Sequence, residues 1–321
     1  MSMSSLFMFV LGLVLAQTPT ASKVPAETLA LQVALDRAGF SPGVIDGQMG
    51  ENTRRAAAAY HKQHGRDVEP SAEPLIEYAI TDADLNGPFA ENIPDDIMKK
   101  AELPALAYES PLELLAERYH ASPALLRRLN PEASFRAGET IQVPNVDPFV
   151  VPAPRLETAA RPREETGTAG RAGRTASEAK PIDKPTVVVT VAKSASALTV
   201  HDAAGRIILY APVTTGSEHD PLPIGNWKVT GIQFSPTFRY NPDLFWDADP
   251  SHAKATLKPG PNNPVGVVWV DLSKEHYGIH GTPEPQAIGK TESHGCVRLT
   301  NWDALRFAGL VEPGTKVVFK Q

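Results

Sequence analysis

A long stretch of low hydrophobicity in the middle of the chain limits how its 321 residues can fold. Between residues 150 and 185 there is no aromatic residue and there are few aliphatic ones, whereas Pro, Ala, Gly, Thr, Arg and Glu dominate. Such a segment cannot bury enough apolar surface to offset the entropy lost on ordering. We therefore predict a flexible linker over residues 148–185, spanning roughly 30 Å or more, so that a C-terminal domain moves freely relative to the front half.

The C-terminal part, residues 186–321, has a pattern typical of β-strands. Short runs of β-branched and apolar residues alternate with Gly, Pro and Asn. The runs are Thr186–Val191, Ala197–His201, Ile207–Ala211, Trp227–Ile232, Val265–Leu272 and Lys316–Phe319. Asp202–Gly205 predicts a hairpin turn, and Asn301–Ala308 predicts one short helix that is capped by Asn301 and ended by Gly309. We expect a mainly β domain, a small sandwich or barrel with one short helix.

The only cysteine of the chain, Cys296, lies in this domain two residues after His294 and sixteen residues after His280. A neighbouring imidazole can remove the proton of a thiol and so activate it as a nucleophile. Gly281 and Gly295 allow close backbone approach, which could leave N–H groups free to face an oxyanion. The pattern favours acyl transfer through a thioester.

Two alternatives use the same residues differently. A lone cysteine is often a small buried hydrophobic side chain. Together with His276, the two histidines and the cysteine could also form a zinc site. Their spacings of four, fourteen and two residues match no recognised zinc pattern, so we expect no metal and no other cofactor.

Seven residues of this region form a pattern of their own: His280, Ser293, His294, Gly295, Cys296, Val297 and Arg298. They resemble the signature of the YkuD-type L,D-transpeptidase catalytic domain, in which a histidine and a variable spacer precede Ser/Thr-His-Gly-Cys, an apolar residue, and Arg or Asn. Asp220–Gly225 resembles the substrate-cleft segment of that family, although Leu-Pro-Ile-Gly replaces the frequent Thr-Pro-Thr-Gly. Gly260–Gly266 and Trp269 resemble the loop and strand that lead to the catalytic histidine.

The resemblance implies a reaction. The Cys296 thiolate would attack the carbonyl of the third residue of a peptidoglycan stem peptide, usually meso-diaminopimelate, and expel the terminal D-alanine. An amine or water would then resolve the thioester. His280 would be the base, held in its tautomer by the Gly281 carbonyl, and His294 and Gly295 would shape the oxyanion site. The implied substrate-binding residues are Arg298, which would bind a carboxylate, Ser293 and Gly225.

Residues 1–16 predict a signal peptide. The apolar run from Leu6 to Leu15 is too short to span a bilayer, and Val14-Leu15-Ala16 is a suitable cleavage site. Because no Lys or Arg precedes the run, an uncleaved N-terminal segment is the alternative. We expect an exported, periplasmic protein with no stable membrane span after cleavage. The net charge of −6 gives no basic field, so nucleic acid is not an expected partner.

Residues 26–80 predict a helical module. Leu31, Ala34, Leu35 and Ala38 share one helical face, Gly39–Gly50 is rich in turn residues, and a second helix ends near Gly65. The stretch from Leu31 to Tyr60 resembles the peptidoglycan-binding helical domain, with Asp46-Gly47 as its most specific point. An ordinary helical hairpin is the alternative.

Residues 103–147 predict an α+β module. Ser110-Pro-Leu-Glu113 has the form of a capping box, Ser122-Pro123 begins a second helix that Asn130-Pro131 ends, and Gly138–Pro144 predicts a strand. These segments resemble a LysM module, which binds glycan, but Tyr108–Leu112 replaces its usual opening strand. A purely structural role is the alternative.

These features predict a multidomain chain in which small helical and α+β wall-binding modules precede a mainly β catalytic domain. The predicted activity is that of a periplasmic L,D-transpeptidase acting on peptidoglycan stem peptides and glycan. Its amine acceptor would be another stem, giving a 3-3 crosslink, or an outer-membrane protein. The alternatives are an L,D-carboxypeptidase and a non-catalytic wall-anchoring protein.

Overall fold

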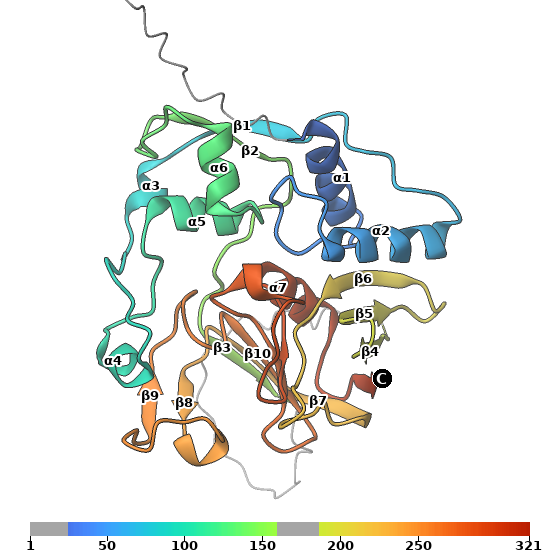
Figure 1. Ribbon diagram of the computed structural model, residues 1–321, viewed down its shortest axis with the longest axis vertical. Coiled ribbons are helices and arrows are strands. Elements are labelled where there is room, and N and C mark those ends of the chain that lie inside the picture. The colour runs from blue at the N-terminus through green and yellow to red at the C-terminus, as the bar shows by residue number, and fades with distance from the viewer. Residues whose placement is uncertain (1–24, 159–185) are drawn as a thin grey trace, which may run out of the picture.

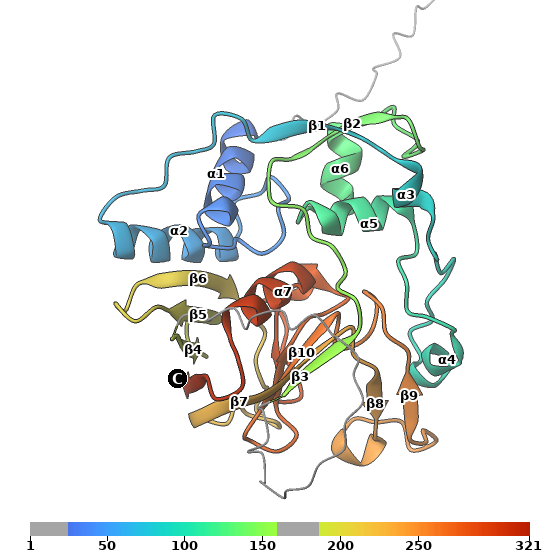
Figure 2. The same cartoon turned by 180° about the vertical axis from the view of Figure 1, so that it is seen from behind.

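The computed structural model describes residues 25–158 and 186–321. The predicted signal peptide and most of the predicted linker lie outside these residues. In the described ranges, no helix is both long and apolar enough to cross a bilayer. Figures 1 and 2 show a helical front half that lies along one side of a β-rich C-terminal half, with α2 beside β6 and α5 beside α7.

The front half begins with the two predicted helices, α1 (Ala26–Arg37) and α2 (Glu51–His64). Gly65 ends α2 with a φ of 68°, a left-handed conformation that glycine adopts without strain. Gln32 is buried in α1 and holds the intervening loop, because its side chain accepts from the Gly47 amide at 2.8 Å and donates to Asp46 at 3.0 Å. The predicted helix, loop and helix are confirmed.

The next part of the front half combines a strand pair with four helices. Its elements are β1 (Leu75–Ala79), α3 (Asp82–Leu85), α4 (Ile97–Glu102), α5 (Pro111–Arg118), α6 (Pro123–Leu129) and β2 (Thr140–Pro144). Ser110 and Ser122 cap α5 and α6 as predicted. Strand β1 pairs antiparallel with β2, with Leu75 opposite Pro144. The predicted module boundary at residue 80 is therefore wrong, because the partner of β2 lies before it.

The C-terminal half is built on one curled sheet of nine strands. Eight of them follow the order β12-β11-β10-β7-β13-β4-β5-β6. Their bounds are β4 (Val188–Ala192), β5 (Ala197–His201), β6 (Ile207–Pro212), β7 (Gly225–Phe234), β10 (Val268–Leu272), β11 (Gly278–His280), β12 (Val297–Arg298) and β13 (Lys316–Lys320). A separate ribbon is formed by β8 (Phe238–Tyr240) and β9 (Ala255–Leu257). The predicted strands are confirmed.

The ninth strand corrects the predicted linker. Residues Arg155–Thr158 form β3, which pairs antiparallel with the second half of β7. Phe149 is buried in the core of the β domain, and the Pro152 carbonyl accepts from Ser235 Oγ at 2.6 Å. A flexible linker over residues 148–158 is therefore wrong. The segment has low hydrophobicity and was therefore predicted to be a linker, but its backbone pairs with the free edge of β7.

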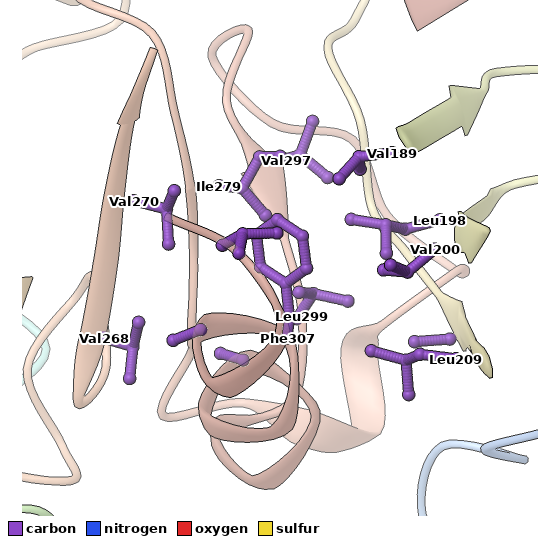
Figure 3. Packing of buried hydrophobic residues seen from close by; sticks show 14 of the residues in the cluster. Val189, Leu198, Val200, Leu209, Val268, Val270, Ile279, Val297, Leu299 and Phe307 are labelled. Carbon is purple, nitrogen blue, oxygen red and sulfur yellow. The ribbon is translucent and has the colours of Figure 1, made fainter. Parts of the chain in front are cut away.

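Helix α7 (Asn301–Leu310) fills the inside of the curled sheet. Figure 3 shows Phe307 of α7 among Ile279, Val297 and Leu299, with Val268 on one side and Val200 on the other. Thr300, and not the predicted Asn301, is the N-cap, because its hydroxyl accepts from the Asp303 amide. The helix also passes Gly309 and ends one residue later.

The two halves are joined by a buried polar interface. The Ser41 hydroxyl donates to Asp303 Oδ2 at 2.7 Å, and the His120 ring stacks on Trp302 with the ring centroids 5.1 Å apart. Ser41 also pairs with β6, donating its amide to the Tyr210 carbonyl at 2.8 Å. The prediction that the halves move freely is wrong. Buried polar groups such as Ser41 and Asp303 need hydrogen-bond partners, and here each finds its partner in the other half.

Candidate active site

The register of four neighbouring strands gathers polar and aromatic side chains on one face of the sheet. His280 of β11 lies beside Arg298 of β12 and opposite Trp269 of β10, and Trp269 lies opposite Gln233 of β7. Side chains two residues apart in a strand point to the same side, so Cys296 shares this face with Arg298. The intervening residues point into the core. Cys296 and His280, sixteen residues apart in sequence, therefore line the same cleft.

These side chains form the floor of a cleft of about 750 Å³. One wall comes from the β8–β9 ribbon and its connection, including Phe245 and Asp247, and another comes from Tyr277. Ile97 of α4, from the front half, also lines the cleft. The volume is in the range of sites that bind small molecules or peptide segments.

His280 is fixed as a neutral base. Its ring is buried, stacks on Trp269 with the centroids 5.1 Å apart, and places Nδ1 2.7 Å from the Gly281 carbonyl oxygen. A carbonyl only accepts, so Nδ1 carries the proton and Nε2 keeps its lone pair. Burial, with a smaller contribution from the Arg298 charge, lowers the pKa of His280 to about 3. The imidazole is therefore uncharged at neutral pH.

Cys296 lies in a tight turn that Ser293 and Gly295 stabilise. Ser293 Oγ donates to the Cys296 carbonyl at 2.6 Å. Gly295 has a φ of 100°, and a Cβ at this position would come within 2.8 Å of the Tyr277 ring. Burial raises the pKa of the Cys296 thiol, although the Gly278 amide and the Arg298 charge act in the opposite direction. At rest, the thiol and the imidazole are thus both neutral.

His294 belongs to the wall of the cleft. Its Nε2 lies 2.8 Å from Asp247 Oδ1, and its ring packs edge-on against Phe245 with the centroids 5.1 Å apart. Asp247 was not predicted from the sequence, because nothing local in the sequence connects it with a residue 47 positions later. This contact joins the cysteine turn to the segment between β8 and β9.

Arg298 presents a positive charge to the cleft. Its side chain is half-buried, and within residues 25–158 and 186–321 no carboxylate forms an ion pair with it. Burial lowers the pKa of Arg298, although the guanidinium remains charged at neutral pH. A half-buried guanidinium without a carboxylate partner is suited to bind an anionic group of a ligand.

Not every predicted site residue lies in the cleft. Cys296, His280, His294 and Arg298 line it, while Gly281 and Gly295 contribute through the backbone. Ser293 does not line the cleft, because its hydroxyl is turned onto the Cys296 carbonyl. Gly225 lies in β7 opposite Phe319 of β13, also outside the cleft. The substrate contacts of Ser293 and Gly225 stay a prediction.

The four residues of the zinc alternative have separate partners. His280 is engaged with the Gly281 carbonyl, His294 with Asp247, and the exposed His276 ring lies 3.6 Å from Glu275. In the described ranges, no three His, Cys, Asp or Glu side chains are placed to share a metal ion.

The C-terminal half is similar to a known family of catalytic domains. Residues 186–319 match the family model of the L,D-transpeptidase catalytic domain, YkuD. The chain is 52% identical over 60 residues to YkuD of Bacillus licheniformis, covering 19% of this chain and 36% of that protein. It is 25% identical over 213 residues to YkuD of Bacillus subtilis (strain 168), covering 65% of this chain and 93% of that protein. Both relatives are named as L,D-transpeptidases.

Among solved structures, L,D-transpeptidase 3 from Mycobacterium tuberculosis is 20% identical, with a TM-score of 0.36, and the match covers 43% of this chain and 62% of that one. The 213-residue match to the Bacillus subtilis protein is longer than residues 186–321, so it reaches into the front half. Residues 186–319 thus match the catalytic domain of L,D-transpeptidases, and the chain spans only about a third of the first of these relatives.

Proposed function

We propose that the chain is an exported L,D-transpeptidase that forms a thioester between Cys296 and the diaminopimelate of a peptidoglycan tetrapeptide stem. D-alanine leaves, and the acyl group passes to an amine. The observation that carries this proposal is the arrangement in one cleft of the thiol, a neutral imidazole and a guanidinium without an ion-pair partner. The match of residues 186–319 to the catalytic domain supports it.

The geometry supports general-base activation in the first half of the reaction. As Sγ bonds to the substrate carbonyl carbon, the thiol proton moves to Nε2 of His280, and the carbonyl oxygen gains the negative charge. When the C–N bond breaks, the leaving D-alanine nitrogen takes that proton back from Nε2. The low pKa of His280 makes its imidazolium a ready proton donor to the leaving amine, and the same low pKa makes the neutral ring a weak acceptor of the thiol proton.

In the second half, the acceptor amine gives a proton to Nε2 and attacks the thioester carbonyl. The C–S bond breaks, and Sγ recovers the proton. We propose that Arg298 holds a carboxylate of the stem peptide during both halves, since no carboxylate of the described residues lies within ion-pair distance of it and Glu284 acts on its charge only from farther away. The Gly295 turn, with the Cys296 amide and His294, would face the oxyanion.

The acceptor and the location belong to the same proposal. The acceptor amine would come from a second stem, which gives a 3-3 crosslink, or from an outer-membrane protein. The signal peptide predicted in residues 1–16 would direct the protein to the periplasm. The helix–loop–helix at α1–α2 and the β1–β2 module would then bind the wall through peptidoglycan glycan.

Two experiments test the proposal. The parent protein should release D-alanine from murein tetrapeptides, and Cys296→Ala should not; equal release by both would contradict the proposal. Imipenem should add its mass to the parent protein at Cys296, whereas Cys296→Ala should gain none. Incubation with purified murein, followed by mass analysis of the muropeptides, identifies the acceptor. Tripeptides without crosslinks would favour an L,D-carboxypeptidase.

A further inference from the structure

A chain of buried hydrogen bonds connects the front half to the residue that orients His280. It begins at Tyr108, whose hydroxyl donates to Glu117 Oε2 of α5 at 2.5 Å. Glu117 Oε1 accepts from Asn301 Nδ2 at the start of α7 at 2.8 Å. Glu117 and Asn301 are 184 residues apart in sequence and both are buried. The proposed reaction uses neither residue directly.

Asn301 is wedged between two backbone segments of the catalytic domain. Its Oδ1 accepts from the Val267 amide at 3.1 Å, and its Nδ2 also donates to the Pro261 carbonyl at 3.2 Å. A Cβ on Gly266 would come within 2.0 Å of Asn301 Oδ1, and a Cβ on Gly281 within 2.2 Å. Only glycine fits at both positions, so the Asn301 side-chain amide packs directly against the backbone at Gly266 and at Gly281.

Gly281 is thereby fixed on three sides. Its amide donates to the Val268 carbonyl at 3.1 Å, its Cα faces Asn301, and its carbonyl accepts from His280 Nδ1 at 2.7 Å. A shift of Asn301 would move the carbonyl that sets the tautomer and the ring plane of His280. A misplacement of about 1 Å in a catalytic group can lower a rate roughly 100-fold.

We propose that Glu117 of the front half is a positioning residue for the His280 base, acting through Asn301 and the Gly281 carbonyl. This inference rests on the proposed function. It assigns the front half a part in catalysis that is separate from wall binding. Both acceptor positions of the Glu117 carboxylate face donors, so the bond to Asn301 keeps one orientation.

The test uses full-length protein and Glu117→Met, which keeps the volume of the side chain but removes both acceptors. We expect the single-turnover rate of imipenem acylation, at saturating imipenem, to fall roughly 10- to 100-fold, with the half-saturating concentration changed less than about twofold. Glu117→Gln keeps an oxygen acceptor for Asn301 and should recover the rate to within about threefold. The proton NMR signal of His280 Nδ1–H should persist in Glu117→Gln and weaken in Glu117→Met.

Glu113→Met is the matched control. Glu113 also lies on α5 and also binds the catalytic domain, accepting from Asn262 Nδ2 at 2.8 Å, but it does not contact Asn301. The acylation rate of Glu113→Met should match that of the parent protein. Asn301→Ala breaks the same link from the other end and should reproduce the loss, which covers the case in which Glu117→Met does not fold.

The outcomes separate this inference from the proposed function. If the parent gains no imipenem adduct and releases no D-alanine, the proposed function fails. If the parent reacts and a folded Glu117→Met reacts equally fast, only the positioning role is overturned. The same holds if Glu117→Gln loses as much rate as Glu117→Met, because the charge and not the bond would then be responsible.

Discussion

Asp36 of α1 and Arg306 of α7 form a two-pronged ion pair across 270 residues of sequence, with N–O distances of 2.8 and 3.1 Å. The Asp36 side chain is completely buried, and His120 lies 3.1 Å from the same carboxylate. Despite the opposing effect of burial, the contacts with His120 and the Arg306 guanidinium hold the pKa of Asp36 well below its usual range. The pair is therefore a charged link in the interior between the two halves.

Removing Arg306 should destabilise the protein strongly. Arg306→Ala leaves a buried carboxylate without its guanidinium partner, and the loss of one partner of such a pair typically costs about 3–5 kcal/mol. Arg206→Ala breaks an exposed ion pair with Asp202 and should cost less than about 1 kcal/mol. Urea unfolding of both variants measures the difference. Equal losses would show that the interface contributes little.

His280 and His276 both line the cleft, but they should differ in importance. His280→Ala removes the proposed base and should lower D-alanine release by roughly 10²- to 10⁴-fold. The exposed His276 ring makes no contact with the thiol, so His276→Ala should stay within a few-fold of the parent. Steady-state assays on a tetrapeptide compare them. Similar losses would mean that the base is misassigned.

The cysteine turn requires glycine at position 295. Gly295→Ala forces a Cβ against Tyr277 at a φ of 100°, and we expect activity to fall at least about 100-fold through displacement of the thiol. Gly309→Ala is the control, because this exposed helical glycine has open space around its Cα. It should raise stability by about 1 kcal/mol and leave activity unchanged. Full activity of Gly295→Ala would contradict the predicted strain.

The cysteine should react with simple alkylating agents only at high pH. Burial raises the pKa of the Cys296 thiol, and the pKa of His280 is lowered to about 3, so no thiolate–imidazolium pair forms at rest. The rate of iodoacetamide alkylation should be low at pH 7 and should rise with pH without a step near pH 6.5. A plateau of fast alkylation between pH 5 and 8 would indicate a resting ion pair.

Glu117 should make a contribution to stability that is lost as the pH rises from about 4 to 8. Burial raises the pKa of Glu117 from 4.5 to about 7, so the folded protein holds this proton more tightly than the unfolded chain. The associated stability is complete below pH 4.5 and is lost as the pH passes 7. For Glu117 the change is on the order of 3 kcal/mol. Glu117→Gln removes this contribution, so the unfolding free energy of the parent should fall relative to that of the variant as the pH rises from about 4 to 8. Parallel curves for the two proteins would contradict this origin.

Local patterns predicted most strands of the C-terminal sheet, the helices α1, α2, α5 and α6 of the front half and the cleft residues Cys296, His280, His294 and Arg298. Periodicity, caps and the family signature are all short-range. Helices α3 and α4 and the strands β1, β3, β8 and β9 were not predicted. The remaining features depend on contacts between distant segments. Nothing near Asp247, Glu117 or Asn301 in the sequence reveals their partners, and β1 is separated from β2 by four helices. The sequence after Phe149 predicted a linker because β3 is a strand only through its pairing with β7, which lies about 70 residues later in the chain.

The pairing of β3 with β7 and of β4 with β13 within one sheet keeps the two halves of the chain together. Residue 158 ends a strand on β7, and the chain returns at β4, which pairs with β13 beside the same β7. The described residues on either side of the gap at residues 159–185, β3 and β4, thus belong to one sheet. A protease cut there would release no domain, and fragments 1–158 and 186–321, produced separately, should reassemble into one working enzyme by complementation.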